Sequence, residues 1–172
     1  FAVLCPLPVA AQAQPYPARP VRLVVPFPPG GINDVLARIT GQKLSESFGQ
    51  SVVVENRPGA GGTIGSNAVA KAAPDGYSLL FGATSTVAVS PNLYANLPYD
   101  PVKDFAPIVQ IASVGSILVV HPAVPAESVA ALVALARARP GSLNFGSAGS
   151  GTSQHMGGEL LKSMAGVDMV HV

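Results

Sequence analysis

Short apolar runs and amphipathic segments alternate along most of the chain. Apolar runs flanked by Gly, Pro and polar residues predict buried β-strands. Segments with apolar residues three or four positions apart predict helices, as Val129, Leu132 and Val133 do within 127–139. The pattern predicts strands at 22–27, 51–55, 77–83, 105–111, 117–121, 143–146 and from 167 onward, and helices at 33–48, 127–139 and 152–165, with another ending near 72.

The order of these elements indicates an α/β fold. Strands that alternate with helices form mostly parallel sheets with helices on both faces. The apolar run 52–54 is typical of a strand buried on both faces. Asn33 or a neighbour is the expected N-cap of helix 33–48, and Gly49 its stop. Ligands of such sheets bind at the carboxyl ends of the strands, so the loops that follow the strands are the candidate sites.

Two glycine- and hydroxyl-rich loops, 26–34 and 146–155, each stand between a strand and a helix. A helix start offers free backbone N–H groups and the positive end of the helix dipole, and glycine lets a ligand approach closely. Each loop is therefore a candidate anion site, and two suggest an anionic small molecule held between two lobes. The second loop adds neutral hydroxyl donors that suit a carboxylate: Ser147, Ser150, Thr152 and Ser153. A third glycine loop, 59–65, is interpreted as a tight strand-to-helix turn.

Composition and charge narrow the function classes. Charged residues make up 11% of the chain and the formal net charge is +1. Since no long basic run occurs, nucleic acid is a poor candidate partner. No Gly-Lys pair, Gly-x-Gly-x-x-Gly or Gly-x-Ser-x-Gly sequence occurs, which argues against a P-loop, a dinucleotide site and a nucleophile elbow. Three scattered histidines and one cysteine make no metal set, so we expect neither a metal nor another cofactor.

Two single residues leave alternatives open. Asp34 lies in the first turn after a glycine pair, where it either caps the helix or contacts a ligand. His155 either bonds a ligand or packs on its helix. Paired with Ser153 or Thr152, it would serve an exported hydrolase, although side chains two apart on a helix point apart.

Residues 1–13 have the pattern of the tail of a secretory signal peptide. Ala11-Gln12-Ala13 is a small-x-small cleavage site, which gives a mature chain from Gln14. A flexible N-terminal extension of a cytoplasmic protein is the alternative. The only cysteine, Cys5, lies in the removed piece. The longest apolar run, 111–120, falls short of the ~18 residues of a membrane span, so we expect an exported protein that is not membrane-embedded.

Many short segments, in one order, resemble the periplasmic receptors of tripartite tricarboxylate transporters, often called Bug receptors. The resemblance covers essentially the whole mature chain. The segments that carry it are 16–22, 25–31 with Asp34, 54–62, 73–77, 97–101 with 104–105, 146–149 through His155, and 165–168.

This resemblance implies a two-lobed α/β Venus-flytrap fold, with lobe one at 14–110 and part of lobe two at 111–172. Family members are nearly twice this length, so the second lobe is expected to be incomplete. They are receptors without catalysis that bind a small carboxylate between the lobes in the periplasm and pass it to membrane transporter subunits; a monomer is the default. An exported serine hydrolase and a ligand-sensing module for a signalling partner remain alternatives.

The resemblance also implies which residues bind the ligand. Lobe two's loop and helix start hold the carboxylate, and lobe one's loop completes the site through backbone groups. Ile32 and Asn33 depart from the small or hydroxyl residues expected there, and Ile32 is expected to narrow the cleft. The expected ligand-binding residues are Phe27, Pro29, Gly30, Gly31, Asn33, Asp34, Thr84, Ser85, Gly146, Ser147, Gly149, Thr152, Ser153 and His155.

Overall fold

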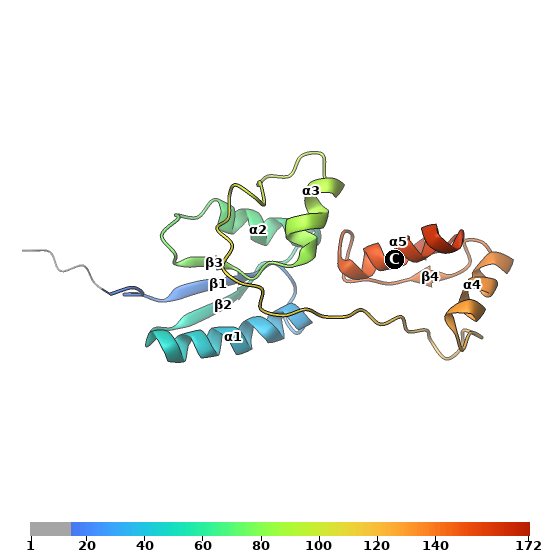
Figure 1. The fold of residues 1–172 in the computed structure, drawn as a ribbon, viewed down its shortest axis with the longest axis horizontal. Coiled ribbons are helices and arrows are strands. Elements are labelled where there is room, and N and C mark those ends of the chain that lie inside the picture. Colours follow the sequence, from blue (N-terminus) through green and yellow to red (C-terminus); the bar gives the residue numbers. More distant parts are fainter. Residues whose placement is uncertain (1–14) are drawn as a thin grey trace, which may run out of the picture.

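The computed structural model describes residues 15–172, so the predicted signal peptide at 1–13 lies outside the described residues. Two parallel β-sheets occupy separate parts of the chain. Figure 1 shows them in two lobes, joined by a long extended segment. The predicted α/β fold with parallel sheets and flanking helices is confirmed.

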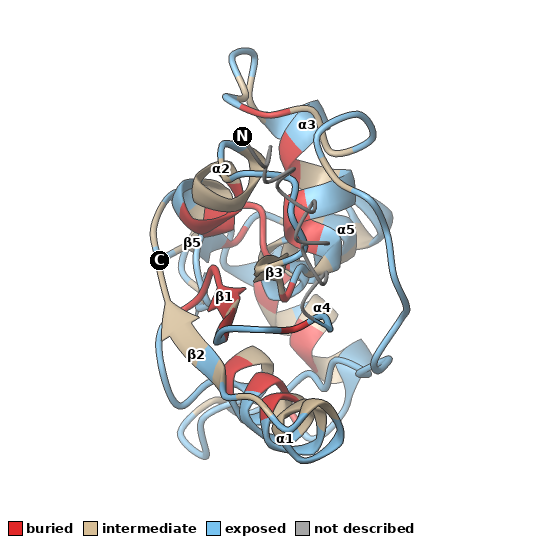
Figure 2. Ribbon diagram, turned by 90° about the vertical axis from the view of Figure 1, so that its left-hand side faces the viewer, coloured by how far each residue is buried: buried red, intermediate tan, exposed pale blue. Residues whose placement is uncertain are grey.

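The sheet of lobe one is built around one central strand. β1 pairs in parallel with both neighbours, in the order β2-β1-β3. Helices cover both faces of this sheet (Figure 1), which explains why burial concentrates on β1 (Figure 2). The elements are β1 (Val21–Val25), α1 (Ile32–Phe48), β2 (Val52–Asn56), α2 (Thr63–Ala70) and β3 (Ser78–Leu80).

Small residues let α1 lie close to the sheet. Ala37 is fully buried, and a Cβ added at Gly41 would lie 3.2 Å from Val54 Cγ2. Dense packing of this kind leaves little room for a larger side chain on the inner face of α1. The buried core cluster is formed by Leu23, Val25, Phe27, Ala37 and Phe81.

Three short helical segments line the end of lobe one where its strands finish. They are η1 (Ala60–Gly62), the π-helical turn η2 (Ser85–Val89) and α3 (Ser90–Leu93). The buried Tyr99 hydroxyl donates a 2.7 Å hydrogen bond to Thr86 O and so fixes η2 in place. Single π-helical turns are rare and often occur at functional sites.

Lobe two contains a second, smaller parallel sheet. β4 and β5 pair in parallel, with Phe145 opposite His171. The N-cap side chains of both helices accept hydrogen bonds: Ser128 Oγ from Ala131 N–H, and Thr152 Oγ1 from His155 N–H. The elements are α4 (Val129–Ala138), β4 (Asn144–Phe145), α5 (Ser153–Ala165) and β5 (Val170–His171).

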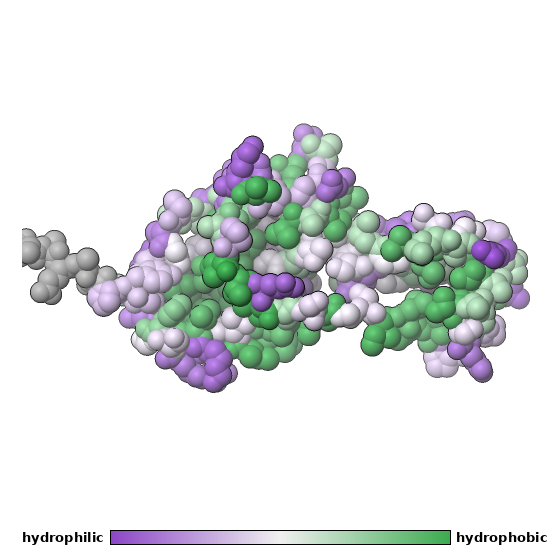
Figure 3. Space-filling view, in the orientation of Figure 1, coloured by the Kyte–Doolittle hydropathy of each residue, from purple (hydrophilic) through white to green (hydrophobic). Residues whose placement is uncertain are grey.

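The prediction of strands at 105–111 and 117–121 is wrong. Residues 105–121 form an extended connection without regular structure. Ile117 and Val119 are 86% and 80% exposed, and Figure 3 shows apolar residues on the surface of this connection and the adjoining part of lobe two. An apolar run becomes a strand only where a neighbouring strand pairs with its backbone, and none of the described strands does so here.

Two finer predictions in lobe one also need correction. The run 52–54 of β2 is not buried on both faces, because Val52 and Val54 pack partly buried against the core whereas Val53 is 51% exposed. Helix α1 begins at Ile32 with Gly31 as the N-cap, and no side chain caps it, so Asn33 is not the cap. Gly49 does end α1, in the left-handed conformation at φ 65°.

Candidate functional site

The loop after β1 is held in shape by Asp34. This buried carboxylate accepts hydrogen bonds from Gly30 N–H at 2.8 Å, Arg38 Nε at 3.1 Å and Asn56 Nδ2 at 2.9 Å. The donors, with the Arg38 hydrogen bond largest, lower the pKa of Asp34 from 3.8 to about 2. Because its oxygens are engaged within lobe one, the structural interpretation of Asp34 is favoured over direct ligand contact.

The other residues predicted in this loop divide by burial. Phe27 packs in the core cluster, so a ligand would meet its backbone and not its ring. Asn33 is half-buried, whereas Pro29, Gly30, Gly31 and Ile32 are exposed. The Gly30 N–H is already used by Asp34. Their contact with a ligand stays a prediction.

Thr84 and Ser85 stand at the start of η2, beside the same loop. Thr84 is exposed and is the N-cap of η2, while Ser85 is buried. A Cβ added at Gly62 would lie 2.6 Å from Thr86 Cγ2 and 3.4 Å from Phe27 Cζ. The first glycine loop, η1 and η2 therefore converge at one end of lobe one.

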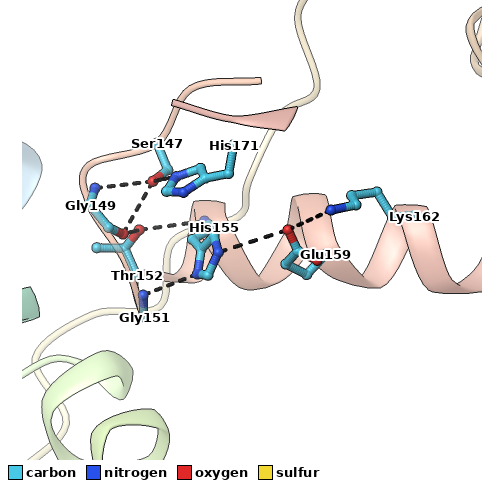
Figure 4. A network of polar contacts seen from close by, with 8 residues as sticks. All are labelled: Ser147, Gly149, Gly151, Thr152, His155, Glu159, Lys162 and His171. Carbon is cyan, nitrogen blue, oxygen red and sulfur yellow. Dashed lines mark hydrogen bonds and ion pairs between the residues drawn. The ribbon is translucent and has the colours of Figure 1, made fainter. Parts of the chain in front are cut away.

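In lobe two, the predicted loop 146–155 is a compact hydrogen-bond network (Figure 4). The Ser147 and Thr152 hydroxyls both donate to Gly149 O, at 3.1 and 2.7 Å. Gly149 N–H donates back to Ser147 Oγ at 3.0 Å. Two hydroxyl donors are thus directed at a single oxygen acceptor at the start of α5.

His155 fixes the end of this loop through its imidazole. Gly151 N–H donates to His155 Nδ1 at 3.1 Å, and His155 Nε2 lies 3.9 Å from Glu159 Oε1. Thr152 Oγ1 serves as the helix cap and donates to Gly149 O, while His155 Nδ1 accepts the Gly151 N–H. The Thr152 hydroxyl and the His155 imidazole are therefore not arranged as a nucleophile and its base. The hydrolase arrangement of Thr152 with His155 is not what the structure brings together.

Gly146 and Ser153, also predicted in this loop, are both exposed beside the network. Ser153 is the first residue of α5. As in lobe one, their contact with a ligand stays a prediction.

Sequence reasoning missed an aromatic group beneath the loop. The rings of His155 and His171 are 4.2 Å apart, and the Phe145 ring is 5.1 Å from His171. His171 Nε2 lies 2.7 Å from Ser147 Oγ. Gly158 on α5 leaves the space that the Phe145 ring fills. Only the pairing of Phe145 with His171 across β4 and β5 reveals this group.

The third glycine loop does more than turn the chain, because it meets lobe two. A Cβ added at Gly61 would lie 2.8 Å from Ser150 O, and one at Gly151 would lie 2.9 Å from Leu93 Cδ2. The lobe-two loop thus packs directly against η1 and α3 of lobe one. Figure 1 shows the carboxyl ends of β1 and β4 each directed toward the other lobe.

No three His, Cys, Asp or Glu side chains within residues 15–172 are grouped so that they could hold a metal ion. In that same range, no helix combines the length and apolar character needed to cross a membrane.

Two lobes of α/β structure, with donor-rich loops at the carboxyl ends of parallel strands, define the class of periplasmic-binding-protein-like receptors. A family model described as "Tripartite tricarboxylate transporter family receptor" matches residues 36–172. The chain belongs to this family, which is one of solute-binding receptors and not of enzymes.

Similar proteins agree with this assignment. Protein BugT of Bordetella pertussis is 43% identical over 162 residues, which are 92% of this chain and 50% of BugT. The structure of R. palustris Rpa4515 with adipate matches with a TM-score of 0.88 and 42% identity, over 91% of this chain and 52% of that one. MatC from Rhodopseudomonas palustris with bound malate matches with a TM-score of 0.80 and 31% identity, over 91% and 53%. The chain spans about half the length of these relatives.

Proposed function

We propose that this protein is an extracytoplasmic solute receptor that binds a small carboxylate between its lobes and delivers it to a tripartite tricarboxylate-type membrane transporter. One observation carries the proposal: the Ser147 and Thr152 hydroxyls converge on Gly149 O at the start of α5. A carboxylate oxygen is a stronger acceptor than a peptide carbonyl and can take over both hydroxyls. The dipole of α5 favours the negative charge at the same place.

Neutral donors suit a carboxylate that must also be released. Hydroxyls and backbone N–H groups hold the anion without burying an opposite charge beside it. Ser153 adds a hydroxyl at the first position of α5. Adipate and malate, the ligands named with the two solved relatives, are both small dicarboxylates, which supports this ligand class for the present chain.

Lobe one completes the site from the opposite side. Since Asp34 takes the Gly30 N–H, the N–H groups in the first turn of α1, which follow the exposed N-cap Gly31, are the ones left for a ligand. Thr84 and Ser85 supply hydroxyls from η2. Closure of the lobes about the 105–121 connection brings both sets of donors onto one molecule, with the division between lobes near residue 110.

The cellular setting follows from the same proposal. The chain is exported by a cleavable signal peptide at 1–13 and acts in the periplasm as a monomer. N-terminal sequencing of the secreted protein tests the cleavage after Ala13, and light scattering tests the monomer.

A thermal-shift panel on the protein in its full natural length tests the function. It compares adipate, malate, a tricarboxylate, an aromatic carboxylate and an acidic amino acid. A ligand at about 100 times its Kd stabilises the folded state by roughly 2.7 kcal/mol. We expect a clear shift with one carboxylate class, lost in Ser147→Ala and kept in Ser163→Ala, an exposed serine further along α5. A well-folded protein that shifts with none of these compounds contradicts the proposal.

A further inference from the structure

His171 stands at the end of β5, directly under the loop that carries Ser147. Its Nε2 lies 2.7 Å from Ser147 Oγ (Figure 4), although the two residues are 24 positions apart. The pairing of Phe145 with His171 in the parallel sheet sets this geometry. Neither the sequence pattern nor the expected binding set assigned His171 a role.

The Ser147 hydroxyl has three polar neighbours. Besides His171 Nε2, they are Gly149 N–H at 3.0 Å and Gly149 O at 3.1 Å. A hydroxyl has one proton to donate and two lone pairs that accept. Gly149 N–H must donate and Gly149 O must accept. All three contacts are hydrogen bonds only if His171 Nε2 carries a proton and donates it to Ser147 Oγ.

We propose that His171 is a positioning residue: its Nε2–H occupies the second lone pair of Ser147 and commits the Ser147 proton to the oxygen acceptor in front of it. This inference rests on the proposed function, because in the receptor that acceptor becomes a ligand carboxylate oxygen. If Nε2 lacked a proton, Ser147 would donate to His171. The Ser147 oxygen would then present only a lone pair to an anionic ligand, and this lone pair would repel the ligand.

The groups around His171 are compatible with this protonation. His155, 4.2 Å away, accepts Gly151 N–H at Nδ1, so its own proton lies on Nε2, near Glu159. Lys162 pairs with Glu159 at 3.0 Å. The Phe145 ring contacts His171 from β4. Within residues 15–172, Ser147 Oγ is the polar partner of His171 Nε2, so the Nε2 proton is directed at Ser147.

The first test reads the proton directly on the unmodified protein. Nitrogen-15 NMR of the His171 imidazole, in the protein at its full natural length and without ligand, distinguishes the two tautomers. We expect a protonated Nε2 at neutral pH. An unprotonated Nε2 bonded to the Ser147 hydroxyl overturns the inference, whether or not the protein binds a carboxylate.

The second test measures whether His171 acts through Ser147. Affinity for the carboxylate that shifts the wild type is compared in Ser147→Ala, His171→Phe and the double variant. His171→Phe keeps an aromatic ring against Phe145 but removes the donor. We expect each single change to weaken binding roughly 10- to 100-fold, as for a hydrogen bond to a charged group. The double variant should be no weaker than Ser147→Ala alone, because the two residues act as one unit.

A conservative variant separates positioning from support of the fold. His171→Gln places an amide N–H where Nε2–H stands, so we expect it to recover most of the affinity lost in His171→Phe. Losses that add in the double variant, or a Gln variant as weak as Phe, overturn the inference. A wild type that binds no carboxylate although Nε2 is protonated overturns the proposed function instead, so the two failures are distinguishable.

Discussion

The backbone N–H of Gly30 donates a 2.8 Å hydrogen bond to the carboxylate of Asp34, four residues later. This bond closes the first glycine loop onto the first turn of α1. Arg38 and Asn56 complete the set of donors, so β2 is tied to the same loop. The shape that the loop presents to lobe two therefore depends on one ionised carboxyl group.

The pH dependence of stability follows from the lowered pKa of Asp34. The pKa of the Asp34 carboxyl is about 2 in the folded protein instead of 3.8, so folding favours the ionised form of Asp34. Its contribution is complete above about pH 4 and is lost as the pH falls toward 2. We expect Asp34→Asn to lower the urea midpoint at pH 7, and this deficit to shrink in that acid window.

Urea titrations of wild type and variant from pH 7 to pH 2 measure this effect. The matched control is Asp75→Asn, which removes an exposed ion pair with Arg19 and should change the midpoint little. A deficit in Asp34→Asn that is the same at pH 2 and pH 7 would contradict the role of the charge.

The burial of β1 and the exposure of β2 predict different costs of truncation. Leu23 is 4% exposed within the core cluster, whereas Val53 is 51% exposed on β2. We expect Leu23→Ala to cost about 2–5 kcal/mol and Val53→Ala to stay within about 0.5 kcal/mol, as surface substitutions usually do. Chemical denaturation of both variants checks this, and equal costs would mean that Val53 is covered in solution.

That contrast shows where the sequence pattern is sufficient. It predicted the helices α1, α2, α4 and α5, and glycines such as Gly49 and Gly166 mark helix ends locally. It failed for Val53 and for 105–121, because an apolar run does not state which strand pairs with it or covers it. His171 was missed for a related reason, since its contact with Ser147 depends on the register of two strands.

The caps of the two lobe-two helices separate stability from binding. Thr152 and Ser128 each accept a hydrogen bond from a backbone N–H at the start of a helix. Replacing either by Ala should destabilise the protein by about 0.5–2 kcal/mol. We expect carboxylate affinity to fall in Thr152→Ala alone, because Ser128 starts α4 and not α5. Calorimetric titration beside thermal melts checks both, and equal affinity losses would mean that Thr152 acts through helix stability.

The contact between lobes gives the last prediction. Gly61 has φ +64° and lies so close to Ser150 that a Cβ would stand 2.8 Å from its carbonyl oxygen. Gly49 has nearly the same φ, +65°, but faces open space. Alanine at either position carries the same left-handed strain, roughly 1–2 kcal/mol. Only Gly61→Ala also pushes the lobe-two loop away from η1.

We therefore expect similar losses of melting temperature in Gly61→Ala and Gly49→Ala, but weaker ligand binding only in Gly61→Ala. A shift of about 1.4 kcal/mol in closure is a tenfold change in affinity, so even a small displacement is measurable. Small-angle scattering with saturating ligand should show a more open Gly61→Ala protein. If both variants bind and close like the wild type, the approach of Gly61 to Ser150 has no part in closure, and the glycine serves the turn alone.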